Sequence, residues 1–237
     1  MFTPNHFIWL GICAVFIGVL LFLSLKYKFT FKTSALIMSA ISVASELLKI
    51  FTHIEETENG GVLGPKYLPL HLCSILIFLI FYVTLSSNKE RVAKVTSFIV
   101  PIAIWGGLLA MIMATSGVNF AKPFAYQCFI YHAGLVWFAL YLLITKQVDL
   151  GLKPYLRNLS TLGILLFVMI WVNSALSAYE TNFFYVVAPP AEGLPLLNLD
   201  NGWFVYFITL VLIGLLLLTL THLPGIIRDA KKLKNKN

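Results

Sequence analysis

YLPLHLCSILIFLIFYV, residues 67–83, places a histidine and a cysteine, His71 and Cys73, at the start of an apolar run. The segment from Cys73 to Tyr82 contains no charged residue and is hard to place anywhere except inside a membrane. An imidazole and a thiol at this position serve a reaction, a transport path or packing. The stretch therefore predicts a membrane protein with polar side chains inside the bilayer.

The composition of the whole chain supports this assignment. Of its 237 residues, 59% are hydrophobic and 11% are charged, whereas an average soluble domain has about 25% charged residues. Apolar runs long enough to cross about 30 Å as a helix recur along the sequence. We therefore expect an all-α fold, a polytopic membrane bundle of seven transmembrane helices in a single domain, 1–237. The expected spans are residues 7–25, 34–53, 67–85, 95–115, 124–145, 159–178 and 203–221, followed by a basic tail at 222–237.

The distribution of lysine and arginine predicts the orientation of the chain. Short cytoplasmic loops retain positive charge, and here the first, third and fifth connections and the tail are basic. We therefore expect the amino terminus outside and the carboxy terminus in the cytoplasm. The net charge of +7 then reflects topology and contact of the tail with anionic lipid, not nucleic acid. The basic residues on the predicted inner side are Lys26, Lys28, Lys32, Lys89, Arg91, Lys94, Lys146, Lys153, Arg157, Arg228, Lys231, Lys232, Lys234 and Lys236; the alternate connections contain Lys66 and Lys122.

The sixth connection, from Glu180 to Gly202, is long and largely apolar, with Phe183-Phe184-Tyr185 followed by Pro189-Pro190. Loops of this length are usually functional, and irregular backbone at membrane depth is tolerated only where protein or a cavity surrounds it. We consider three interpretations: a lid over a site, a re-entrant segment, or an interfacial anchor.

Polar residues on the second span share one helix face. Ser39, Ser42, Glu46, Lys49 and His53 follow one another at steps of three or four residues. Ionisable groups inside a membrane are costly and mark a functional site by default. The alternative is a structural pair of Glu46 and Lys49 that joins helices.

Depth along the helices brings further polar groups to the same outer level. At about 1.5 Å per residue, Cys73, His132 and Asn173 all fall in the outer half of the bilayer. His71 and Cys73 are two residues apart, about 200° around a helix, so His71 is a poor base for Cys73 unless Pro69 leaves the turn irregular.

His132 is the first choice of base, because a cysteine nucleophile is typically activated by a histidine distant in sequence. Cys128 lies one turn from His132, so the choice of nucleophile between Cys73 and Cys128 stays open. The three cysteines, with Cys13, have no paired spacing, and we expect no disulfide framework, no metal site and no cofactor.

These residues carry a resemblance to a known family. Pro69–Cys73, Trp105-Gly106-Gly107, His132, Asn173 and the loop motif Asn182-Phe183-Phe184-Tyr185 look like the YwaF-like family of seven-span bacterial integral membrane proteins, over nearly the whole chain. That family is similar to an animal family described as acyltransferases that remodel ether phospholipids, with a membrane-embedded Cys and His implicated. The resemblance implies that Cys73 accepts the acyl group, that His132 is its base, and that His71 shapes the site. It also implies a multi-pass protein of the bacterial cell membrane.

Two functions follow as hypotheses. The first is a lipid acyltransferase, transacylase or acyl hydrolase that acts on membrane phospholipids, with Asn173 or His71 as oxyanion stabiliser and Asn182 among the binding residues. Acyl-coenzyme A is not available on the outer side, so a phospholipid is the expected acyl donor. The second is a transporter or binding protein for a proton or small solute that uses Glu46, Lys49 and His53. A membrane protein without a site is the remaining possibility.

Overall fold

A computed structural model describes residues 2–56, 61–114, 116–191 and 193–235. Within these residues the fold is all-helical, as predicted. Six helices are long and apolar enough to cross a membrane, and one apolar helix is shorter. The chain is therefore a multi-pass membrane protein. The helices are α1 (Pro4–Lys26), α2 (Phe31–Glu56), α3 (Leu72–Leu85), α4 (Lys89–Met113), α5 (Pro123–Ile144), α6 (Leu152–Ala175) and α7 (Trp203–Lys234), with 3-10 helices η1 (Pro65–Tyr67), η2 (Ser177–Tyr179) and η3 (Phe183–Tyr185).

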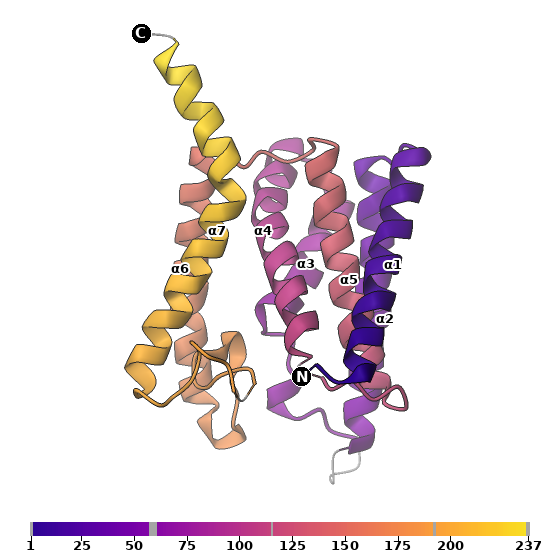
Figure 1. Ribbon diagram of the computed structural model, residues 1–237, viewed down its shortest axis with the longest axis vertical. Helices are drawn as coiled ribbons and strands as arrows, with labels where there is room; N and C mark the ends of the chain where they lie inside the picture. Colours follow the sequence, from indigo (N-terminus) through magenta and orange to yellow (C-terminus); the bar gives the residue numbers. More distant parts are fainter. Residues whose placement is uncertain (1, 57–60, 115, 192, 236–237) are drawn as a thin grey trace.

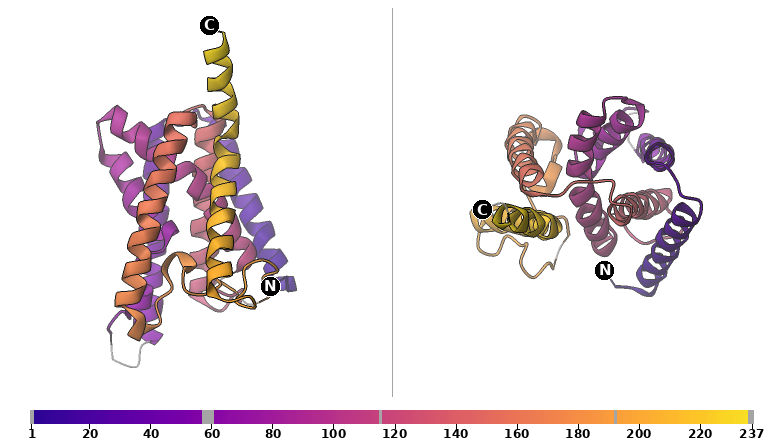
Figure 2. Two further views of the ribbon diagram at one scale, coloured as in Figure 1. Left: turned by 90° about the vertical axis from the view of Figure 1, so that its left-hand side faces the viewer. Right: turned by 90° about the horizontal axis from the view of Figure 1, so that it is seen from above.

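The helices form two groups (Figures 1 and 2). In the first group α5 lies at the centre and packs against α1, α2 and α4, while α3 packs between α2 and α4. In the second group α6 and α7 pack against each other and contact the first group mainly through α4. The amino terminus and the α6–α7 loop lie at one end of the molecule, and the carboxy terminus lies at the other (Figure 1). We refer to these as the amino-terminal and carboxy-terminal ends.

The third helix is shorter than the predicted span of residues 67–85. Its 14 residues are about 21 Å long, less than the roughly 30 Å of a hydrocarbon core. Pro69 lacks an N–H and restricts the preceding residue, Leu68, to extended conformations. Leu68 (φ −55°, ψ 145°) and His71 (φ −65°, ψ 151°) are both extended. Residues 68–71, between η1 and α3, are therefore not helical, and α3 begins at Leu72.

The last helix is longer than predicted. It continues from Trp203 to Lys234, past the expected end at residue 221 and through most of the segment expected as a tail. Pro224 lies inside the helix and does not end it. The basic residues Lys231, Lys232 and Lys234 thus lie on the last turns of a membrane helix and not in an irregular tail.

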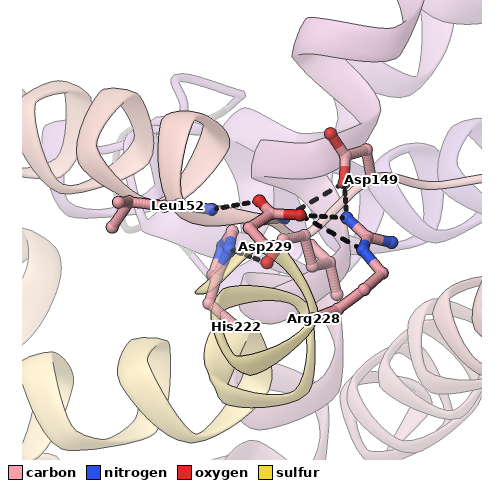
Figure 3. A network of polar contacts seen from close by, with 7 residues as sticks. Asp149, Leu152, His222, Arg228 and Asp229 are labelled. Carbon is pink, nitrogen blue, oxygen red and sulfur yellow. Dashed lines mark hydrogen bonds and ion pairs between the residues drawn. The ribbon is translucent and has the colours of Figure 1, made fainter. Parts of the chain in front are cut away.

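A polar network fixes this extension of α7 to the connection between α5 and α6 (Figure 3). The Arg228 guanidinium donates to the Asp149 carboxylate at 2.7 Å. Asp229 accepts from the N–H of Leu152, the first residue of α6, at 3.1 Å. His222, which is fully buried, lies 3.0 Å from the Leu150 carbonyl oxygen through Nδ1. These contacts explain why the helix persists beyond the apolar segment.

Candidate functional site

Cys73 lies in the first turn of α3, at the end of the irregular segment. The Tyr131 hydroxyl donates to the Cys73 carbonyl oxygen at 2.7 Å and so fixes the start of α3 against α5. On the other side the Cys73 thiol lies against Gly106 of α4, where an added Cβ would be 3.0 Å from Sγ. The absence of a side chain at Gly106 therefore makes room for the thiol.

His132 on α5 is oriented by its own helix. Its Nδ1 lies 2.7 Å from the Cys128 carbonyl oxygen. Because a carbonyl can only accept, Nδ1 carries the proton and donates, and Nε2 is the nitrogen left to act as a base. The Cys73 thiol, on α3, lies near enough to the same imidazole to interact with it electrostatically. Cys73 and His132 thus come from different helices and are neighbours in the same cluster.

The second glycine of the predicted motif brings α4 close to His132. A Cβ at Gly107 would lie 2.9 Å from the His132 carbonyl oxygen and 2.7 Å from Val136 Cγ2. The absence of side chains therefore lets α4 contact both candidate residues. Gly106 lies against the Cys73 sulfur, and Gly107 lies against the backbone of His132. Trp105 beside them donates from Nε1 to Thr221 on α7 at 2.8 Å.

The two candidate thiols differ in access and in their relation to the base. Cys128 is 1% exposed, whereas Cys73 and His132 are partly exposed. The Cys128 sulfur lies 3.6 Å from Nδ1 of His132, the nitrogen that already donates to a carbonyl. The Cys128 thiol therefore cannot give its proton to Nδ1, which is already protonated. The geometry therefore favours Cys73 as the thiol that His132 activates and that a substrate reaches.

The polar face of α2 borders the same cluster. Lys49 Nζ and Glu46 Oε1 form an ion pair at 2.7 Å, and Lys49 is 8% exposed. The Glu46 carboxylate is close enough to Tyr131 to interact with it electrostatically, and the Lys49 ammonium is close enough to His71 to do the same. These charges thus line one side of the cluster. His53, nearer the end of α2, stacks on Tyr67 with ring centroids 3.6 Å apart.

His71 belongs to the cluster, although helical spacing predicted that it would point away from Cys73. That prediction assumed a helix, and His71 precedes the first helical residue. Its imidazole lies within electrostatic range of His132 and Lys49. It also contacts two aromatic rings of the α6–α7 loop, Phe183 at 5.4 Å and Tyr185 at 5.1 Å between centroids.

Asn173, predicted as an oxyanion stabiliser, has a different set of partners. Its Nδ2 donates to the Met169 carbonyl at 2.7 Å and to the Phe183 carbonyl at 3.0 Å. Its Oδ1 accepts from the Phe183 N–H at 2.8 Å. Since both N–H groups of the amide are used within the protein, Asn173 positions the loop and has no donor left for a substrate.

Asn182 has a similar role within the loop itself. It donates to the Ala188 carbonyl at 2.8 Å and accepts from the N–H groups of Val187 and Ala188 at 3.0 and 3.2 Å. A pocket of about 590 Å³ lies beside this loop, lined by Asn173, Asn182 and Trp203 among others. Cys73 and His132 are not among its lining residues.

Sequence reasoning missed the amino-terminal N–H groups of α3 as a possible oxyanion site. His71 is the N-cap, and no side chain among the described residues caps this helix. The first N–H groups of a helix have no partner inside it. The signal that could have indicated this site is Pro69, which predicts a helix start just before Cys73.

The remaining histidines are structural. His6 accepts from the Phe2 N–H at 2.9 Å and lies 2.9 Å from the Met111 carbonyl oxygen through Nε2. His222 belongs to the network of Figure 3. Among the described residues no group of three His, Cys, Asp or Glu side chains is arranged to hold a metal ion.

The sequence matches the TMEM164 family, a family of transmembrane proteins, over residues 1–222. The match includes every residue of the cluster around Cys73. No curated protein and no solved structure matches the chain. The family name states no reaction, so the chemistry has to be argued from the site.

Proposed function

The chain belongs to the TMEM164 family, and from that premise we propose that it is a membrane-embedded phospholipid acyltransferase with Cys73 as nucleophile. The single observation that best supports this is the partly exposed Cys73 thiol beside His132, whose Nδ1 is already occupied. The pairing of a thiol with a base that is itself oriented by a third group is the usual arrangement of a nucleophilic site. The resemblance to the YwaF-like and animal acyltransferase families gives independent support.

The proposed reaction has two steps. In the first, His132 Nε2 takes the thiol proton while Cys73 Sγ attacks the ester carbonyl of a phospholipid. The carbon–oxygen bond breaks, the lysophospholipid leaves with the proton from His132, and the acyl group stays on Cys73 as a thioester. In the second, the hydroxyl of an acceptor lysophospholipid attacks the thioester and gives its proton to His132, which returns it to the sulfur.

The start of α3 supplies the electrostatic part of this mechanism. A helix amino terminus carries partial positive charge and favours a thiolate in its first turn. The N–H groups of Leu72 and Cys73 are without a side-chain cap and lie beside the reacting thiol. We assign to them the stabilisation of the oxyanion, the task that sequence analysis gave to Asn173 or His71.

The orientation of the site in the membrane is part of the proposal. The basic connections favour the amino-terminal end as the outer end, with α3 and the irregular segment before it making the third of seven crossings. The cluster around Cys73 then faces the outer half of the bilayer, in the bacterial cell membrane. There a phospholipid is the available acyl donor.

The charged face of α2 is better explained by this function than by a transport path. Glu46 and Lys49 pair with each other at 2.7 Å and lie beside Tyr131 and His71. An ion pair in this position makes one side of the reaction site polar. Tyr131 lies on the same side and donates to the Cys73 carbonyl oxygen.

The test is acyl transfer by the purified protein in lipid nanodiscs, with a labelled phospholipid donor and a lysophospholipid acceptor. Cys73→Ala is expected to abolish both transfer and the labelled thioester, and His132→Gln to slow transfer by about 10²–10⁴-fold. Cys128→Ser is expected to retain most activity, because the reaction uses only its backbone carbonyl; Cys13→Ser is the matched control. Transfer by Cys73→Ala at the wild-type rate would overturn the proposal.

A further inference from the structure

The segment Thr181–Ala188, which we call the α6–α7 loop segment, lies against the start of α3. Phe183 is fully buried and Val186 is 2% exposed. The rings of Phe183 and Tyr185 both contact the His71 imidazole. In Figure 1 this orange loop lies at the amino-terminal end, beneath α6 and α7. The segment thus meets the reaction cluster through His71.

Two asparagines hold the segment in this shape. Asn173 of α6 bonds both the N–H and the carbonyl of Phe183, at 2.8 and 3.0 Å. Asn182 bonds the backbone of Val187 and Ala188 across the turn. Side-chain bonds on both sides of the short 3-10 helix η3 therefore hold Phe183 in its buried position.

The first turn of α7 holds the same segment from the other side. The Tyr206 hydroxyl donates to the carbonyl oxygens of Tyr185 and Ala188, sharing its one proton between them, with the Ala188 bond at 2.9 Å. Trp203 Nε1 donates to the Val186 carbonyl at 2.8 Å. Tyr185 has a positive φ of 56°, which is unfavourable for a residue with a side chain. These bonds stabilise a conformation that the segment would not adopt alone.

The position of the segment matters because an acyl thioester has two possible fates. A lysophospholipid hydroxyl gives a phospholipid and the free thiol. Water, attacking the same carbonyl carbon and losing its proton to His132, gives a fatty acid and the free thiol. Closing a site against water suppresses such side reactions. At the amino-terminal end, the residues that lie against His71 from the α6–α7 side are Phe183 and Tyr185.

We propose that Phe183 and Tyr185 exclude water from the thioester and so favour acyl transfer over hydrolysis. The bonds of Asn173, Asn182 and Tyr206 hold these two rings against His71. The inference rests on the proposed function and adds a selectivity element to it. Phe183 and Tyr185 are positioning and shielding residues, and neither takes part in a bond that forms or breaks.

The first experiment measures the ratio of fatty acid released to acyl groups transferred, in nanodiscs with labelled phospholipid and lysophospholipid. Tyr206→Phe removes the shared hydroxyl bond and leaves the ring. We expect the ratio to rise about fivefold, the change that follows from loss of one hydrogen bond. Asn182→Ala removes three bonds, and we expect a rise of about tenfold or more. Tyr179→Phe is the matched control, because Tyr179 is 55% exposed on the neighbouring η2, and its ratio should equal that of the wild type.

The second experiment does not depend on acyl chemistry. In a background with Cys13→Ser and Cys128→Ser, a charged, membrane-impermeant thiol reagent should modify Cys73 several-fold faster when Tyr206→Phe or Asn182→Ala is added. If Tyr206→Phe and Asn182→Ala both transfer acyl groups with the wild-type ratio of hydrolysis to transfer, and Cys73 is labelled at the wild-type rate in both, this inference is wrong and the proposed function is unaffected. No acyl transfer or hydrolysis by the wild type would overturn both.

Discussion

Replacement of Gly107 by alanine tests the close packing of α4 on α5 at His132. The new Cβ would lie 2.7 Å from Val136 Cγ2 and 2.9 Å from the His132 carbonyl oxygen, whereas carbon atoms in good contact are about 3.5–4.0 Å apart. Val136 can shift its side chain, but the carbonyl belongs to the central helix and cannot rotate away. Overpacking of this kind costs about 1–3 kcal/mol.

Gly18 of α1 supplies the matched control, because a Cβ there meets nothing within 4 Å. Alanine is favoured over glycine inside a helix by about 1 kcal/mol, and this gain is common to both variants. The overpacking cost therefore remains as their difference. Gly107→Ala should be less stable than Gly18→Ala by about 2 kcal/mol.

The measurement is unfolding of each purified variant in mixed micelles with increasing denaturing detergent, followed by helical circular dichroism. The difference in the free energy of unfolding between the two variants is the quantity of interest. Equal stability of Gly107→Ala and Gly18→Ala would refute the close approach of α4 to His132, and with it the geometry from which the site is built.

Three further predictions follow from single contacts. Gly106→Ala places a Cβ 3.0 Å from the Cys73 sulfur. The thiol must shift by a few tenths of an ångström, which should lower the transfer rate about tenfold, while the gain of about 1 kcal/mol from alanine in a helix keeps the variant folded; an unchanged rate would contradict this. Asn173→Ala leaves buried backbone groups of Phe183 without partners and should cost about 2–3 kcal/mol in the same unfolding assay, so a neutral result would show that the loop is held otherwise. Burial raises the pKa of the Asp149 carboxyl, but its bonds from Arg228 and a backbone N–H outweigh burial and hold the pKa below its ordinary value. The resulting stability is present above the unfolded pKa of about 3.9 and is lost as the pH falls through the folded pKa. An unfolding series from pH 6 to pH 3 should therefore show a loss of stability in the wild type that is absent from Asp149→Asn. The loss should be less than about 1 kcal/mol, because the ion pair is exposed.

The two prolines show how far helix positions can be predicted from this sequence. Apolar length predicted each of the seven helices, but α7 continues to Lys234 where an end at residue 221 was expected. Pro69 and Pro224 had opposite effects. Pro69 keeps Leu68 extended, and His71 is extended as well, so that α3 starts only at Leu72. Pro224 lies inside α7, where the contacts of Arg228 and Asp229 with the α5–α6 connection hold the following turns. Sequence alone does not show those tertiary contacts, so it cannot distinguish a proline that ends a helix from one that is tolerated.

For the site, neighbouring residues could be predicted from their positions along the spans, whereas side-chain directions could not. Counting residues along the spans placed Cys73, His132 and Asn173 at one level, and the first two do lie together. The Asn173 amide bonds to Phe183, ten residues ahead in the α6–α7 loop. His71 was assigned a direction from helical periodicity, which does not apply to a residue that precedes the helix. Periodicity gives a side chain's direction only where the backbone is helical.

The two helix groups link the proposed selectivity of the site to contacts far from it. α1–α5 supply Cys73 and His132, while the loop segment that covers His71 comes from α6 and α7. At the carboxy-terminal end, α6 is held to α4 by Asn158, which donates to the Ser97 carbonyl at 2.7 Å. From Asn158 to the end of α6 is about 25 Å, so a tilt of about 5° there would move the loop by about 2 Å. That displacement is enough to separate Phe183 and Tyr185 from the imidazole. If Phe183 and Tyr185 shield the site as proposed, the buried polar contacts at one end of the bundle therefore help to keep it covered at the other.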